Sequence, residues 1–293
     1  MSSGIENDES YLVKKERKVD LQTLMKYFEP IEWEMNDFHN LNLETLEMDN
    51  THLSSVPESI LEIEYYAFRE VQAVSFNYNP NLKDASVLGK LENLQAINMW
   101  GCNLEEVPES WARLKKISFL GLANNPNLTN FSAIASMNSL QFLDLGCCGL
   151  KRLPQEIVQI SSHLVVLALG GNVDIEIDSA TISKLRKLRR LSLNDCGLNE
   201  VPQGVYELSQ LRHLHVDNND VTTLSQHVLK LHQLVGLSVT GNPEIRLPKI
   251  MGQMEMLQQV VVDDVYDVTK ISFQIRSKVR RRSHVRSVFI PKQ

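Results

Sequence analysis

The sequence lacks the features of a membrane protein and of a disulfide-rich secreted protein. No run approaches the roughly 18 apolar residues that a membrane-spanning helix requires. The start, MSSGIENDES, is polar and acidic, whereas a secretory signal is basic and then apolar, so we expect no export by the general secretory route. The four cysteines are too few for a disulfide scaffold and have no CxxC spacing. We therefore expect a reducing compartment and a cytoplasmic location.

Sequence motifs of catalysis and cofactor binding are also missing. The sequence has no GxxxxGK[ST] loop for phosphates, no GxGxxG after a strand, no HExxH, no GxSxG and no EF-hand loop. The prediction is a protein that is not an enzyme and has no cofactor and no metal.

Apolar residues are abundant, and charge is distributed unevenly. The 293 residues are 43% hydrophobic and 23% charged, which is enough apolar material for a large core. Residues 1–70 hold sixteen acids and six bases, whereas residues 270–293 hold eight bases and no acid. The basic end, Lys278 to Arg286, is interpreted as a solvated face of a terminal cap, with an anionic-partner patch as the alternative.

An internal repeat decides the architecture. The pattern LxxLxL occurs ten times, from Leu43-Leu46-Met48 to Leu257-Val260-Val262. Successive copies start 28 residues apart once and 23 or 24 residues apart thereafter. Such a regular period predicts a solenoid, which grows by stacking neighbours.

A second fixed position lies three residues beyond the LxL and holds Asn or Cys in eight of the ten repeats. A chain that turns sharply inside the stack needs a compact polar side chain to bridge buried backbone groups. We therefore assign these residues to a structural ladder, which leaves Cys147 as the one cysteine outside it. The ladder residues are Asn79, Cys102, Asn125, Cys148, Asn172, Cys196, Asn219 and Asn242.

These repeats resemble those of leucine-rich repeat proteins. Segments such as Leu150-Lys-Arg-Leu-Pro154-Gln-Glu-Ile157 and Leu198-Asn-Glu-Val-Pro202-Gln-Gly-Val205 are similar to the 23-residue LPxxI type of bacterial and Ras-suppressor-like proteins. The resemblance covers residues 41–269 and implies an α/β leucine-rich repeat solenoid with a curved parallel sheet on its concave face. The short period predicts turns, short 3₁₀ helices and extended segments on the convex face.

Both ends of a solenoid need caps. Residues 1–40 are expected to comprise a disordered start and a helical cap, with Asp20 as N-cap and Leu21, Leu24, Met25 and Phe28 on one face. The extra residues of the first repeat, Leu61 to Phe68, fit a helical turn on the convex side. Residues 270–293 are expected to form a basic cap or tail, in which Ile271, Phe273 and Ile275 alternate like a closing strand.

The concave face carries the candidate binding site, because strand alternation turns the residues between the pattern leucines outward. Phe119, Phe142 and Val166 are expected to form a contiguous exposed ridge beside small residues, with Trp100 diagonally across. Exposed aromatic side chains are typical of protein-binding sites. The alternative is that these rings pack only on one another.

Charged residues on the same face indicate the kind of partner. Acids outnumber bases, with Asp144 and Asp217 among them and Arg190 as the one base, which favours a partner with a basic fringe and disfavours nucleic acid. His213 and His215 have the HxH spacing of zinc ligands but lack a third one nearby, so we interpret them as polar interface residues.

The resulting prediction is a non-enzymatic module that binds a protein or peptide on its concave face. Two alternatives stay open: a bacterial effector that binds a host protein, and a regulatory subunit of an enzyme such as a phosphatase. The predicted partner-binding residues are Trp100, Phe119, Phe142, Asp144, Val166, Arg190, His213, His215 and Asp217.

Overall fold

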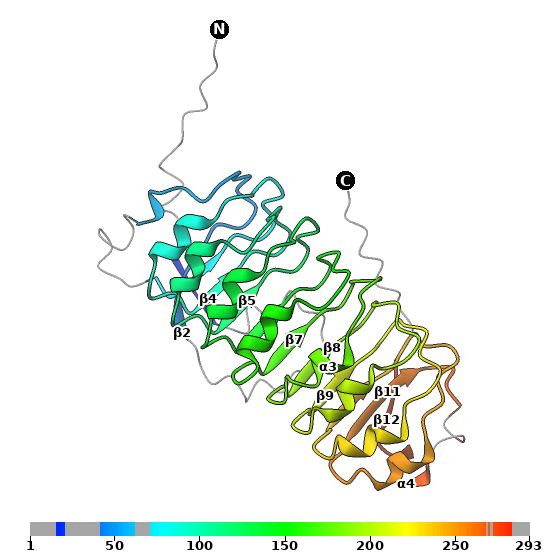
Figure 1. Ribbon diagram of the computed structural model, residues 1–293. Coiled ribbons are helices and arrows are strands. Elements are labelled where there is room, and N and C mark those ends of the chain that lie inside the picture. The colour runs from blue at the N-terminus through cyan, green and yellow to red at the C-terminus, as the bar shows by residue number, and fades with distance from the viewer. Residues whose placement is uncertain (1–15, 21–41, 62–70, 268, 270–271, 283–293) are drawn as a thin grey trace.

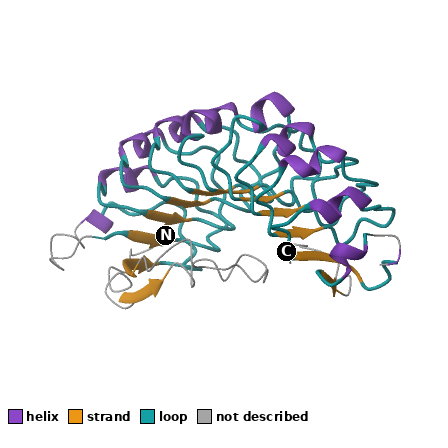
Figure 2. Cartoon of the chain, turned by 90° about the horizontal axis from the view of Figure 1, so that it is seen from below, coloured by secondary structure: helices purple, strands orange, loops and turns teal. Residues whose placement is uncertain are grey.

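The computed structural model describes residues 16–20, 42–61, 71–267, 269 and 272–282, and these form one continuous arch. Twelve strands make a single sheet in sequence order, in which β1 pairs antiparallel with β2 and all later pairs are parallel. Figure 2 shows the strands along the inner side of the arch and the short helices along its outer side. The predicted leucine-rich repeat solenoid with a curved parallel sheet is confirmed.

Most strands have three residues, because a repeat contributes the first residue of its LxL pattern, which points inward, and the outward-facing residue on either side of it. Their bounds are β1 (Glu16–Asp20), β2 (Asn42–Glu47), β3 (Ala73–Ser75), β4 (Ala96–Asn98), β5 (Phe119–Gly121), β6 (Phe142–Asp144), β7 (Val166–Ala168), β8 (Arg190–Ser192), β9 (His213–His215), β10 (Gly236–Ser238), β11 (Gln259–Asp263) and β12 (Val279–Arg282) (Figure 1).

The convex side is built from single turns of helix, as the short period predicts. Most are 3₁₀ helices, and several begin directly after the proline of the LPxxI segment, which fixes φ at the helix entry. Their bounds are η4 (Ser86–Lys90), η5 (Glu109–Arg113), η6 (Ser132–Ser136), η7 (Gln155–Ile160), α3 (Ser179–Ile182), η8 (Gln203–Glu207), η9 (Gln226–Lys230), η10 (Lys249–Gln253) and α4 (Phe273–Arg276).

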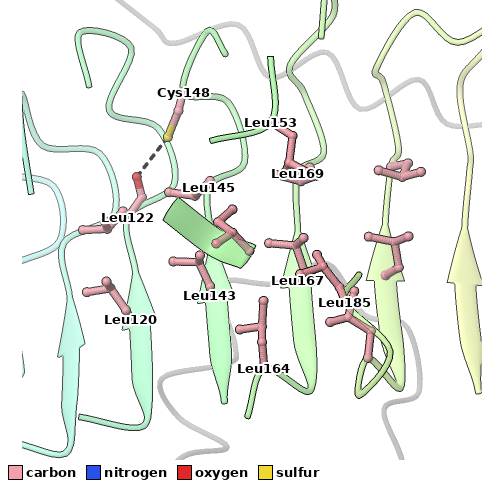
Figure 3. Packing of buried hydrophobic residues seen from close by; sticks show 14 of the residues in the cluster. Leu120, Leu122, Leu143, Leu145, Cys148, Leu153, Leu164, Leu167, Leu169 and Leu185 are labelled. Atoms are coloured by element: carbon pink, nitrogen blue, oxygen red, sulfur yellow. Dashed lines mark hydrogen bonds between the residues drawn. The ribbon is translucent and has the colours of Figure 1, made fainter. Parts of the chain in front are cut away.

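The core is a ladder of leucines between the sheet and the convex turns. Leu143 and Leu145 of one repeat lie beside Leu167 and Leu169 of the next, and all four side chains are fully buried (Figure 3). Burying a leucine contributes on the order of 2 kcal/mol, so stacking repeats supplies most of the stability.

Asparagine side chains clamp neighbouring repeats together. Asn172 Oδ1 accepts hydrogen bonds from the backbone N–H groups of Cys148 and Leu150, at 3.0 and 2.9 Å. Its Nδ2 donates to the carbonyls of Leu145 and Leu169. Cysteine at the same position makes fewer contacts, since Cys148 Sγ lies 3.2 Å from the Leu122 carbonyl. The asparagines are therefore the stronger links between repeats.

One residue per repeat adopts left-handed backbone geometry immediately after the third outward position, and its N–H donates to the next repeat. Glycine, asparagine and aspartate tolerate this geometry. Cys147, with φ 51°, and Tyr78, with φ 58°, are the two residues in this row of other types. The row consists of Asn50, Tyr78, Gly101, Asn124, Cys147, Gly171, Asp195, Asn218 and Gly241.

Replacing Cys147 by asparagine is expected to raise the free energy of unfolding by about 1 kcal/mol, because asparagine tolerates left-handed geometry better than cysteine does. Burial raises the pKa of the Cys147 thiol, as do the nearby Asp144 and Asp195, so no reactive thiolate is lost. Urea unfolding of the Cys147→Asn variant checks this, and a fall in stability would show that the thiol packing outweighs the backbone cost.

The C-terminal end differs from the sequence expectation. The predicted closing strand at Ile271, Phe273 and Ile275 is wrong, because residues 273–276 form α4, which occupies the convex position of the other short helices. Only Ile275 of α4 is buried there. The closing strand is β12, inside the basic segment, and it pairs in parallel with β11.

At the N-terminal end, the structure adds β1, which the sequence analysis did not predict. Asp20, the expected N-cap, is the last residue of that strand. The predicted cap helix with Leu21, Leu24, Met25 and Phe28 lies outside the described residues, as do residues 1–15 and all of Leu61 to Phe68 except Leu61.

Candidate interaction surface

The concave face consists of parallel rows, since each strand pairs in register with the next. The first row contains Phe119, Phe142, Val166, Arg190 and His213 on successive strands. The second row lies two residues further along each strand. It contains Asn98, Gly121, Asp144, Ala168, Ser192 and His215. These rows bring together the predicted site residues of β5 to β9.

The predicted exposed ridge of Phe119, Phe142 and Val166 is wrong in one respect, because these side chains are only 1–2% exposed. The rings of Phe119 and Phe142 stack with centroids 4.4 Å apart and an interplanar angle of 12°. Strands of a sheet lie about 4.8 Å apart, so identical flat side chains in register stack face to face. The ridge is a packed apolar strip along the row.

A third row follows the strands, and several of its side chains hydrogen-bond to the next repeat. Asp49 Oδ1 accepts from Asn77 N and from Ser75 Oγ, both at 2.7 Å. Asp217 Oδ1 accepts from Thr240 N at 2.7 Å and from Ser238 Oγ at 2.6 Å. These carboxylates satisfy backbone donors where the strands end. Asp217, which we expected to face a partner, is 8% exposed and engaged in this way.

Asp144 lies at the centre of the second row, between Gly121 and Ala168. It is 4% exposed, and its Oδ1 accepts one hydrogen bond, from the Gly146 N–H at 2.8 Å. Burial raises the pKa of this carboxyl group to about 7, and the hydrogen bond from Gly146 offsets only part of that shift. Asp144 is therefore only partly ionised at neutral pH and adds little negative charge to the face.

The concave rows of β8 and β9 contain a buried arginine, Arg190, and a buried histidine, His215. Arg190 is 4% exposed, and His215, one strand further on, is equally buried. Burial, together with the positive charge of Arg190, lowers the pKa of His215 to about 4, so this imidazole is neutral at pH 7. Within the described part of the chain, no group of three His, Cys, Asp or Glu side chains is placed to hold a metal ion.

Comparison with known proteins agrees with the repeat geometry. The family model for the leucine-rich repeat region matches residues 161–278. The chain has a leucine-rich repeat fold. No curated protein matches its sequence. Within the described residues, no helix is long and apolar enough to span a membrane.

Solved leucine-rich repeat structures share the fold of this chain. The leucine-rich repeat domain of the type III effector XopL has a TM-score of 0.61 and 21% identity, covering 74% of this chain and 75% of that chain. Internalin C2 of Listeria monocytogenes has a TM-score of 0.55 and 21% identity, covering 71% and 84%. The internalin inlF of the same species has a TM-score of 0.50 and 18% identity, covering 65% and 61%, so the chain spans less than two thirds of inlF.

One aromatic pair of this leucine-rich repeat solenoid lies at the border of the concave face. Tyr78 is 41% exposed and contacts Trp100 edge-on, with ring centroids 4.5 Å apart. Trp100 was predicted as a site residue, whereas Tyr78 was not. A tyrosine in the row that otherwise favours Asn, Gly and Asp is the signal that could have identified it.

Asn98 is the second residue that the sequence analysis did not single out. Its side chain is 1% exposed, and neither its amide nitrogen nor its amide oxygen has a hydrogen-bond partner within the described residues. It lies in the second row against Gly121, where an added Cβ would come within 2.5 Å of the Asn98 Oδ1. Buried amides are rarely left without partners, so Asn98 marks a place that suits a polar ligand group.

Proposed function

We propose that this chain is a non-enzymatic interaction module that binds a protein or peptide partner on the concave face between β3 and β9. The observation that carries the proposal is the concave surface itself, where apolar, aromatic and polar side chains of these seven strands lie in register. Solenoid repeats produce extended concave surfaces of this kind, and they serve as binding surfaces. The fold alone does not name the partner.

The charges of the face support a protein partner more than a nucleic acid. Glu47 and Asp49 lie at its N-terminal end, and a partner with a basic fringe suits them. Phosphates would be repelled there. A cytoplasmic location is supported by the four free cysteines, three of which are buried in the repeat core.

A second candidate function is that of a bacterial effector that binds a host protein. It is favoured by the likeness to the XopL repeat domain, which belongs to a type III effector. A secretion assay in the source organism separates the two, since a housekeeping interaction protein stays inside the cell.

The proposed function is tested by capture from source cytosol with three forms of the chain. One variant blocks the concave face by Ala168→Gln and Ser192→Gln, two half-buried neighbours on β7 and β8. The matched control carries Val173→Gln and Met256→Gln, at exposed positions outside the concave rows. We expect a protein retained by the wild type and the control but lost from the blocked variant. Equal retention by all three forms would rule out the concave face as the binding site.

A further inference from the structure

The N-terminal end of the concave face combines two aromatic rings with two carboxylates. Tyr78 and Trp100 form their edge-on pair where β3 and β4 end. Asp49 accepts a hydrogen bond from the N–H of Asn77, the residue before Tyr78. Burial, and secondly the Asp49 carboxylate, raises the pKa of Tyr78; burial, with a small addition from Glu47, raises the pKa of Asp49. These four residues, on or just after β2 to β4 (Figure 1), are called the aromatic–acidic site below.

One carboxylate of this site, Asp49, is bound by neutral groups of the next repeat. It accepts hydrogen bonds from the Ser75 hydroxyl and from the backbone and side-chain N–H groups of Asn77. The lysines of the same repeats form ion pairs elsewhere, Lys83 with Glu105 and Lys90 with Glu58, each at 3.0 Å. A face with aromatic rings and negative charge is complementary to a cation, which is attracted both by the ring faces and by the carboxylates.

Tyr78 occupies a position that the fold itself does not favour for tyrosine. Its φ of 58° is left-handed geometry, which is costly for a bulky residue, and most other repeats place Asn, Gly or Asp there. The ring is also 41% exposed, so burial does not offset the cost. Asn98, two residues before Trp100 on the same face of β4, adds an independent observation, because its buried amide lacks a partner within the described residues.

We propose that the aromatic–acidic site binds an arginine or lysine side chain of an extended segment of a protein partner. The cation lies against Tyr78 and Trp100 and faces Glu47 and Asp49. The Asn98 side chain turns outward on binding, and its amide then pairs with a peptide group of the same segment, since an asparagine side chain offers one acceptor and two donors to the N–H and C=O of a backbone. This inference rests on the proposed function, as it names the partner chemistry at one end of the same face.

The test uses two synthetic peptides, acetyl-Gly-Arg-Gly-Arg-Gly-amide and the same peptide with citrulline, the neutral isostere of arginine, in both arginine positions. Isothermal titration calorimetry with the full chain is expected to show about tenfold tighter binding of the arginine peptide. Tyr78→Asn and Trp100→Leu are each expected to weaken that binding about fivefold at unchanged net charge. Equal binding of the two peptides would overturn the proposal.

Cys147→Asn is the matched control, because it changes the other unfavourable residue of the left-handed row far from the aromatic pair. It is expected to bind the arginine peptide as the wild type does. Tyr78→Asn is expected to have a urea midpoint at or near that of the wild type, so its loss of binding is not a loss of folding. Wild-type binding by Tyr78→Asn would exclude a role for the ring. If the arginine and citrulline peptides bind equally while the variant with Ala168→Gln and Ser192→Gln loses the captured protein, this inference is refuted and the proposed function stands.

Discussion

Replacement of Asn172 by alanine is expected to lower the free energy of unfolding by about 3–5 kcal/mol, the largest effect of any single substitution considered for this chain. The Asn172 side chain satisfies four buried backbone groups in two repeats, those of Cys148, Leu150, Leu145 and Leu169. Alanine leaves both N–H groups without this acceptor, and each unsatisfied buried group costs about 1–3 kcal/mol. Chemical denaturation monitored by circular dichroism measures the effect.

Cys148→Ala is the control for this prediction, since it changes a ladder residue of the neighbouring repeat. The Leu122 carbonyl, which lies 3.2 Å from Cys148 Sγ, also accepts a hydrogen bond from Asn125 Nδ2 at 2.8 Å. Loss of the thiol therefore leaves that carbonyl paired, and we expect a cost of about 1 kcal/mol from the small cavity. Equal losses in the two variants would mean that the asparagine clamp is not the dominant link between repeats.

Replacement of Asp144 by asparagine is expected to stabilise the chain at alkaline pH by about 4 kcal/mol. The folded chain raises the pKa of Asp144 to about 7, above its ordinary value of 3.8, because the carboxyl group is buried. The folded state thus binds the proton more tightly than the unfolded state does. The stability contributed by Asp144 is fully present below pH 3.8 and is lost as the pH rises to about 7.

The gain from Asp144→Asn should accordingly be near zero at pH 4, grow until about pH 7 and then stay constant. His215→Gln gives the opposite profile. The pKa of His215 is lowered from 6.5 to about 4, so its stabilisation is present above pH 6.5 and is lost as the pH falls to about 4. Urea midpoints of the three forms between pH 4 and 8 check both slopes. A pH-independent effect of Asp144→Asn would show that this carboxyl group is ionised at all these values.

Much of the fold could be predicted because the same sequence pattern occurs in ten successive repeats. The period, the short convex turns and the rows of the concave face follow from residues such as Leu143 and Leu145, whose alternation is unambiguous. Where the repeat is not sustained, prediction failed. The strand β12 lies in the basic segment Val279–Arg282, and the alternation of Phe273 and Ile275 was equally compatible with one turn of helix.

The concave surface was harder to predict, because row membership does not give exposure. Phe119 and Phe142 were placed in the correct row, but their stacking depends on the spacing of strands and on two flat side chains meeting in register. Asp217 was placed on the correct face, but its carboxylate is used by Thr240 of the next repeat. Such contacts join residues more than twenty positions apart, and one sequence gives no direct sign of them.

Photocrosslinking to the captured partner tests the central claim, that the concave face is the binding surface. A photoreactive benzoylphenylalanine is placed at position 100 or 213 on the concave side, or at position 256, where Met256 is exposed outside the concave rows. We predict covalent adducts with the partner from positions 100 and 213 and none from position 256. Adducts from position 256 with none from positions 100 and 213 would contradict the assignment and place the partner elsewhere on the solenoid.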